Sequence, residues 1–130
     1  MLQRNKGKIL NNRKLGEEKE QLAAQFLETK GYSIISRNFS CRTGEIDIIA
    51  VKDRYICFTE VKYRKNSKSG TPESAVTTSK MIKICKCAEY FLHTHSKFMS
   101  YQMRFDVIAI ENEEIRHYEN AFSYVLTNSF

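Results

Sequence analysis

The chain has 130 residues, of which 42% are hydrophobic and 28% are charged, and these proportions are ordinary for a soluble globular domain. No apolar run approaches the roughly 20 residues that span a bilayer, and the N-terminus lacks the apolar core of a secretory signal, so we expect a cytoplasmic protein with no membrane partner. The formal net charge of +6 suits a polyanionic partner such as nucleic acid, although a solubilising surface would account for it equally well.

The first predicted elements are a helix and three strands. A flexible basic segment over residues 1–12 precedes a single domain over residues 13–130. Between residues 14 and 30, apolar residues recur at intervals of three, four and seven, which predicts a helix. The three predicted strands that follow span residues 32–39, 45–51 and 55–63.

A polar loop with the sequence KNSKSG leads into the second half of the domain. Thr71 is the expected cap of a second helix and Pro72 its first residue, because proline has no amide hydrogen to satisfy at that position. Two further strands are predicted over residues 103–110 and 115–118. The order of helices and strands, αβββαββ, predicts an α/β domain with a mixed central sheet and flanking helices.

The four cysteines raise the question of a metal site or a disulfide. They are Cys41, Cys57, Cys85 and Cys87, and their spacings contain no Cys-x-x-Cys pair. Cys57 fits the interior of a strand, and Cys85 fits the apolar side of the second helix. We therefore predict reduced structural thiols.

Three charged residues, Asp47, Glu60 and Lys62, lie within two otherwise apolar strands. A buried charge costs several kcal/mol unless it is paired or bound to a metal. In a hairpin that pairs Lys52 with Tyr55, the register continues as far as the two acids. Asp47 then lies directly opposite Glu60 with Cβ atoms about 5 Å apart, and Lys62 projects from the same side. A hairpin loop of three residues would instead move Glu60 to the opposite face.

Two carboxylates so close together repel each other unless a positive charge lies between them. A divalent cation with hard oxygen ligands, Mg²⁺ or Mn²⁺, is one answer, and Lys62 alone is another. A metal and a lysine suit phosphodiester hydrolysis, because the metal acidifies a bound water and the ammonium neutralises charge on phosphorus. The alternative is a structural ion pair of Lys62 with Glu60 or Asp47 at a strand end.

Several motifs resemble one known family. GEIDIIA followed by FTEVKYR is similar to the paired motif of the YraN family, small bacterial proteins of largely unassigned function. The segments GEEKEQLAAQFLETKGYSIISRNF, GTPESAVTTSKMIKICKCAEYFL, RFDVIAI and HYENAF are similar to other parts of that family, so the resemblance covers nearly the whole chain. It implies the restriction-endonuclease-like fold of the PD-(D/E)xK nuclease superfamily, which includes archaeal Holliday junction resolvases.

The resemblance also implies roles for single residues. The superfamily's metal-binding acids fall on Asp47 and Glu60 and its lysine falls on Lys62, so these three are the expected catalytic residues. An additional metal-binding acid falls on Glu20, and Lys80 matches a lysine that would meet a phosphate; solvated helix charges would explain both equally well. From the charge distribution, the residues expected to contact nucleic acid are Arg64, Lys65, Lys68, Lys80, Lys83 and Lys86.

The resulting prediction is a metal-dependent nuclease, with DNA favoured as its substrate and RNA left open. One alternative is a nucleic-acid-binding module that has the same fold and does not cut. Another is a protein-interaction domain in which the three charges form only a salt-bridge cluster. The sequence leaves open whether the substrate is a duplex, a flap or a branched junction, and a homodimer would suit the two-fold symmetry of a junction.

Overall fold

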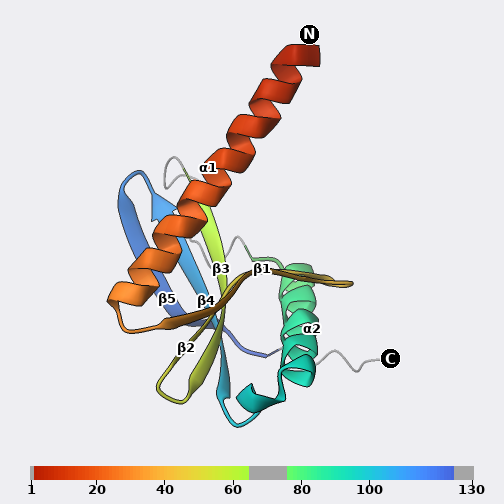
Figure 1. The fold of residues 1–130 in the computed structure, drawn as a ribbon, viewed down its shortest axis with the longest axis vertical. Helices are drawn as coiled ribbons and strands as arrows, with labels where there is room; N and C mark the ends of the chain where they lie inside the picture. The colour runs from red at the N-terminus through yellow and green to blue at the C-terminus, as the bar shows by residue number, and fades with distance from the viewer. Residues whose placement is uncertain (1, 65–75, 125–130) are drawn as a thin grey trace.

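The computed structural model of the chain describes the backbone of residues 2–64 and 76–124 and, from residue 13 onward, their side chains. A five-stranded sheet has the order β1-β2-β3-β4-β5 (Figure 1). Neighbouring strands are antiparallel except for β3 and β4, which are parallel. The elements are α1 (Leu2–Thr29), β1 (Ser33–Cys41), β2 (Gly44–Lys52), β3 (Tyr55–Arg64), α2 (Thr78–Thr94), the 3-10 helix η3 (Ser96–Phe98), β4 (Gln102–Glu111) and β5 (Glu114–Phe122).

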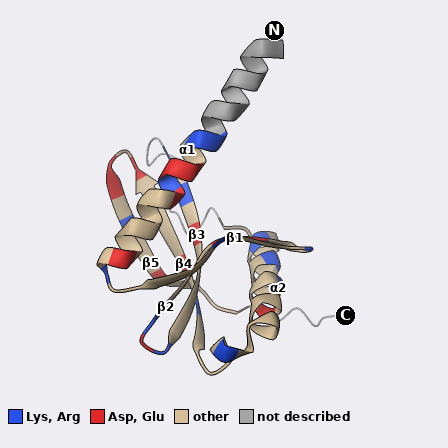
Figure 2. Ribbon diagram, viewed as in Figure 1, with Lys and Arg blue, Asp and Glu red and all other residues tan. Residues whose placement is uncertain are grey.

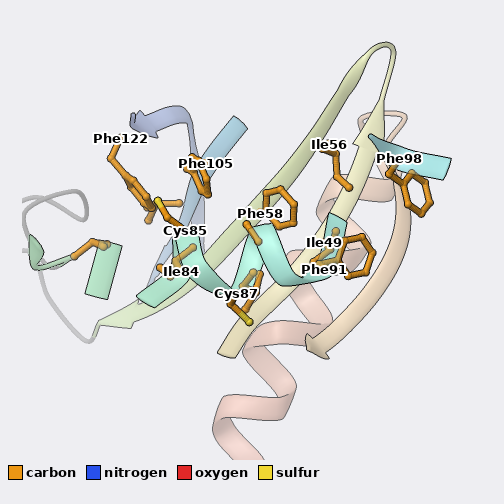
Figure 3. Packing of buried hydrophobic residues seen from close by; sticks show 14 residues of the cluster. Ile49, Ile56, Phe58, Ile84, Cys85, Cys87, Phe91, Phe98, Phe105 and Phe122 are labelled. Carbon is orange, nitrogen blue, oxygen red and sulfur yellow. The ribbon is translucent and has the colours of Figure 1, made fainter. Parts of the chain in front are cut away.

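The two helices cover opposite faces of this sheet and divide the core into two apolar layers. The α1 layer joins Leu27 to residues such as Ile48 of β2, and the α2 layer joins Phe91 to residues such as Phe58 of β3 (Figure 3). α2 also connects β3 to β4, because parallel neighbours require a crossover of this kind. The predicted order αβββαββ and the mixed sheet are confirmed, as expected for a restriction-endonuclease-like core. Within the described part of the chain, neither helix is long and apolar enough to cross a membrane.

The first helix begins earlier than predicted. The prediction placed its start at residue 14, whereas α1 begins at Leu2. The prediction relied on apolar spacing, which begins at Leu15, but a helix continues wherever residues have adequate helix propensity and no proline intervenes. The mobility predicted for residues 1–12 is a separate property and stays a prediction.

The start of the second helix is also different from the prediction. Thr71 and Pro72 lie outside the described residues, but Thr77 is not helical, so α2 does not run unbroken from Pro72. α2 begins at Thr78, and the Thr77 hydroxyl oxygen caps it by accepting a 3.2 Å hydrogen bond from the backbone N–H of Lys80. The prediction relied on the proline that follows Thr71, and it did not consider Thr77 as a cap.

The β2–β3 hairpin has the register that the sequence predicted, with Lys52 opposite Tyr55. Its turn contains Asp53 with a φ of 55°, a left-handed conformation that aspartate and asparagine tolerate better than most residues. This local conformation explains how KDRY makes a tight turn without glycine. The hairpin carries the acids of the candidate site toward its open end.

Candidate metal and phosphate site

The candidate site lies where β2 and β3 stop pairing. The ladder ends at Ile48 and Thr59, one position before Asp47 and Glu60 would form the next pair of the same register. Asp47 Oδ2 instead accepts a 2.9 Å hydrogen bond from the backbone N–H of Val61. A carboxylate thus replaces a strand partner, and the predicted direct pairing of the two acids does not occur.

Glu60 is buried, with 5% of the residue exposed, and two lysines bind it. Its Oε1 lies 3.3 Å from Nζ of Lys62 and 2.5 Å from Nζ of Lys80. Lys62 comes from the same strand, and Lys80 comes from the first turn of α2. The predicted Glu60–Lys62 ion pair is therefore present, and a second lysine extends it.

A group of three acids includes the other predicted acid, Asp47. Glu20 of α1, Glu45 of β2 and Asp47 each offer one carboxylate oxygen, and these oxygens lie within 4.8 Å of one another. Glu60 is not part of this group among the described acids. Glu45 was not predicted, although it precedes Asp47 by two residues, a strand spacing that places side chains on one face.

Asp47 is an unusual acid because negative charges surround it. Burial and the nearby Glu60 carboxylate raise the pKa of Asp47 to about 7, with a further contribution from Glu20 and an opposing one from Lys80. Burial also raises the pKa of Glu20, and the charge of Glu45 adds to this effect. Burial is the largest cause of both shifts and the neighbouring carboxylates add to it, whereas Asn38 and Arg37 partly offset the shift at Glu20.

The two lysines of the site respond to it in opposite directions. Burial and the adjacent Lys80 lower the pKa of Lys62. Burial also acts to lower the pKa of Lys80, but its hydrogen bonds to Glu60 and Lys62 and the charges of Glu60 and Asp47 together raise it. Lys80 is thus held firmly as a cation, whereas Lys62 gives up its proton more readily than an ordinary lysine.

Two of the predicted nucleic-acid contacts line a basic groove beside the site. Lys83 and Lys86 of α2 face Arg42 of the β1–β2 turn across a hollow of about 700 Å³, and basic residues gather on the N-terminal half of α2 (Figure 2). The turn and the helix approach closely, because a Cβ added to Gly44 would lie 3.4 Å from Cβ of Lys83. The other lining residues are Thr43, Ser79 and Ile82.

Arg64, another predicted contact, does not line this groove. Arg64 lies opposite Glu111 in the β3–β4 ladder, and its Nη2 is 3.4 Å from Glu111 Oε1. Only 12% of the Arg64 side chain is exposed, which suits an ion pair between strands better than a phosphate contact. Lys65 and Lys68 lie outside the described residues.

A second polar cluster, which the sequence did not predict, surrounds Asp106 of β4. This acid is fully buried and accepts hydrogen bonds from the Arg104 guanidinium, from His117 and from the backbone N–H of Asn120. Nδ1 of His117 accepts a 2.9 Å bond from Nζ of Lys30, so Nε2 carries the ring proton that is donated to Asp106. Burial alone would raise the pKa of Asp106, but these donors lower it below its usual range.

Comparison with known proteins places relatives across most of the chain. The model of uncharacterised protein family UPF0102 matches residues 19–110, a region that contains every candidate site residue from Glu20 to Lys86. The chain is 44% identical over 113 residues to a UPF0102 protein of Lachnoclostridium phytofermentans, which is 87% of this chain and 96% of that protein. It is 50% identical over 99 residues to one of Clostridium perfringens, covering 76% and 80% of the two chains. It is 47% identical over 108 residues to one of Thermodesulfovibrio yellowstonii, covering 83% and 95%.

Proposed function

The chain belongs to the UPF0102 family, as the resemblance of its motifs predicted, and we propose that it is a metal-dependent nuclease that hydrolyses phosphodiester bonds in DNA. The observation that supports this proposal is that three clustered acids and two lysines, both ion-paired with the buried Glu60, lie at the open end of the β2–β3 hairpin. The acids are Glu20, Glu45 and Asp47, and the lysines are Lys62 and Lys80 on Glu60.

The three acids suit a small divalent cation. Carboxylate oxygens are hard, anionic ligands of the kind that Mg²⁺ and Mn²⁺ prefer. The raised pKa of Asp47 points the same way, because a cation would remove the repulsion that contributes to it. Such a cation, when bound, supplies Lewis acidity toward a phosphate oxygen and an acidified water for attack on phosphorus.

Glu60 anchors two ammonium groups whose other sides remain open to solvent. The Lys62 and Lys80 side chains are 24% and 39% exposed, while the Glu60 side chain is only 6% exposed. We assign Lys62 to the reacting phosphate, where its charge would stabilise the transition state, and Lys80 to an adjacent phosphate oxygen. A phosphate that draws Lys80 away would also leave Glu60 Oε1 available to a cation, which is the role that the resemblance implied for this acid.

The basic groove supplies a path for the nucleic-acid backbone. Arg42, Lys83 and Lys86 place positive charge on both walls, and the groove begins on the helix that also carries Lys80. Contacts to phosphates are independent of base sequence, so they suit an enzyme that recognises DNA shape. A homodimer acting on a four-way junction fits this proposal, because two such grooves related by a two-fold axis would match the symmetry of that substrate.

The test is a cleavage screen over linear, flapped and four-way-junction DNA with Mg²⁺, with Mn²⁺ and with a chelator. We expect metal-dependent cleavage of at least one substrate by the wild type and none by Asp47→Asn. Asp53→Asn is the matched control, because it removes an acid from the exposed turn of the same hairpin and asparagine tolerates its left-handed backbone. It should cleave at the wild-type rate.

The two alternatives give different results in this screen. Tight binding to these DNAs without cleavage under any metal condition would select a binding module of the same fold. The absence of DNA affinity even at low salt would select the protein-interaction domain, in which Glu60, Lys62 and Lys80 form only an ion-pair cluster.

A further inference from the structure

Two of the four cysteines meet where the β1–β2 turn touches α2. Cys41 is the last residue of β1 and is partly exposed, whereas Cys87 is buried on α2. The Cys87 thiol points toward the two carbonyl oxygens that flank the turn, at 3.9 Å from Phe39 O and 3.7 Å from Gly44 O. Cys41 pairs with Gly44 in the β1–β2 ladder, and the carbonyl of the same Gly44 faces the Cys87 thiol, so both cysteines meet at this turn. They are 46 residues apart in the sequence, so only the fold brings them together.

The surroundings of Cys41 favour its thiolate. Its Sγ lies 3.1 Å from the Thr43 hydroxyl oxygen, and the turn also directs the backbone N–H groups of Thr43 and Gly44 toward it. Burial acts to raise the pKa of Cys41, but these donors and the Cys87 thiol together lower it. A thiolate that is partly exposed and hydrogen-bonded is the form of cysteine that reacts with oxidants.

The other thiols are in the opposite situation. Burial, with the adjacent Cys41 as a further cause, raises the pKa of Cys87 to about 12, and burial raises the pKa of Cys57 to about 12. Cys85 is completely buried in the α2 layer. One accessible thiol therefore lies beside one protected thiol, which is the arrangement of a reacting cysteine and a resolving cysteine.

We propose that Cys41 and Cys87 form an oxidation site for hydrogen peroxide. The Cys41 thiolate attacks one peroxide oxygen, the O–O bond breaks, and hydroxide leaves and takes up a proton, so Cys41 becomes a sulfenic acid. The Cys87 sulfur then attacks the Cys41 sulfur and displaces the hydroxyl group, which leaves as water with the Cys87 proton. The balance is two thiols oxidised to one disulfide while one peroxide is reduced to two waters.

This disulfide would join the two walls of the basic groove. Arg42 and Thr43 belong to the turn that follows Cys41, and Lys83 and Lys86 precede Cys87 on the helix. The bond would therefore fix the turn against α2 at the place where Gly44 already approaches Lys83. The proposed oxidation requires neither a metal nor DNA, so it stands or fails separately from the proposed nuclease activity.

The experiment treats the reduced full-length protein with hydrogen peroxide and maps its peptides by mass spectrometry. We expect an intramolecular Cys41–Cys87 disulfide, lighter than the reduced pair by two hydrogen atoms. In Cys87→Ala the reaction should stop at a Cys41 sulfenic acid that dimedone traps, and Cys41→Ser should form neither product. Cys57→Ser is the matched control and should give the wild-type disulfide.

A second measurement does not depend on any variant folding. In the reduced wild type, iodoacetamide should alkylate Cys41 at least about tenfold faster than each of the other three thiols near neutral pH, because the thiolate is the nucleophile. Equal labelling of Cys41 and a buried thiol would overturn the proposal. A peroxide product that joins two chains, or the absence of any Cys41 product, would overturn it as well.

Discussion

Asp47 and Asp106 are acids of two strands in the same sheet, and their surroundings differ in kind. Asp106 is fully buried, yet its pKa is lowered because Arg104, His117 and a backbone N–H all donate to it. Asp47 is partly buried, and its pKa is raised to about 7, first by burial and then by the carboxylates of Glu60 and Glu20, while the single backbone N–H of Val61 opposes the shift. Burial therefore acts to raise the pKa of both acids, and hydrogen-bond donors reverse its effect only at Asp106.

The hydrogen-bond donors around each carboxylate account for the difference between the two acids. A buried acid whose oxygens already accept hydrogen bonds from the protein stabilises the folded structure and has no lone pair available for a ligand. An acid held among other acids keeps an unfavourable charge that a cation or a phosphate-bound lysine can relieve, and such groups are concentrated at functional sites. The Asp106 cluster is thus the structural one, and the cluster around Asp47 and Glu60 is the one suited to chemistry.

The largest expected effect is on stability at the Asp106 cluster. Asp106→Asn would leave the Arg104 guanidinium buried without its carboxylate and would set an amide N–H₂ against other donors. We expect a loss of about 3–5 kcal/mol in the free energy of unfolding, as for other broken buried ion pairs. Asp47→Asn, the matched change at the candidate site, should be neutral or mildly stabilising without metal, because it removes repulsion. Urea unfolding of both variants measures the difference, and equal losses would contradict the contrast between the two clusters.

The next largest effect is on the cleavage rate, and it distinguishes a catalytic role of Lys62 from a structural one. Lys62→Met keeps the aliphatic length but deletes the ammonium, so cleavage should fall by about 10²-fold or more. Stability should change by less than about 1 kcal/mol, because Lys80 still neutralises Glu60. Lys62→Arg should restore activity only partly, since a planar guanidinium replaces a compact ammonium. Single-turnover cleavage and urea midpoints are the two measurements.

A structural role for Lys62 would give the reverse order. Lys62→Met would then lower the urea midpoint strongly, arginine would rescue it, and the wild type would have no metal-dependent cleavage to lose. The double variant Lys62→Met with Lys80→Met provides the reference for that case. It leaves Glu60 buried without either partner and should destabilise the domain under both interpretations.

The sequence predicted part of the geometry around the candidate site but not the donors around each acid. The hairpin register, with Lys52 opposite Tyr55, is the one that a two-residue turn between them predicts, and Glu20 lies near Asp47 as the resemblance implied. The ion pair of Lys80 with Glu60 was not predicted. Local pairing rules could not reveal that the ladder stops before Asp47. The ladder stops there because the Asp47 carboxylate accepts the hydrogen bond from the backbone N–H of Val61, and such a side-chain contact depends on the tertiary structure.

The sequence patterns did not predict the Asp106 cluster. Its histidine receives a hydrogen bond from Lys30, which lies 87 residues earlier in the chain. Asp106 lies within the apolar segment FDVIAI, as Asp47 lies within IDIIA, but no periodicity connects it with donors so distant in the chain. Glu45 was missed for a different reason, because its strand spacing to Asp47 was visible in the sequence but was not used.

The third effect is the response to divalent cations and to pH. The folded pKa of Asp47, about 7, is above its ordinary value of 3.8, so its contribution to stability is complete below about pH 4 and is lost as pH rises through about 7. Asp106 has the opposite shift, so its contribution is complete above the ordinary value and is lost as pH falls. In the metal-free protein, Asp47→Asn should therefore remove the loss of stability toward neutral pH and leave the acid limb unchanged.

A cation binds deprotonated carboxylates, so its effect should grow over the same pH range. At a free Mn²⁺ concentration one hundred times the dissociation constant, stabilisation should reach about 2.7 kcal/mol. It should be larger at about pH 8 than at about pH 6, and it should vanish in Asp47→Asn but persist in Asp53→Asn. A melting temperature that does not respond to millimolar Mn²⁺ at either pH would count against a preformed metal site.

The smallest expected effect concerns the basic groove, which has no role in stability if it only contacts DNA. Replacing Lys83 and Lys86 with glutamine should change the unfolding free energy by less than about 0.5 kcal/mol, because both side chains are exposed on the surface. The plot of log K against log salt for DNA binding should become shallower by about one for each phosphate contact removed, since fewer counterions are released. The control replaces Lys97 and Arg116, the latter on β5 at the opposite edge of the sheet from β1, and should keep the wild-type slope.

Lys80→Gln should differ from both pairs, because it alters the salt slope and also removes a cation from Glu60. A Lys83 and Lys86 variant that binds DNA with the wild-type slope would show that the groove is a solvated surface, and the contrast with the Asp106 cluster would then depend on the acids and lysines of the candidate site alone.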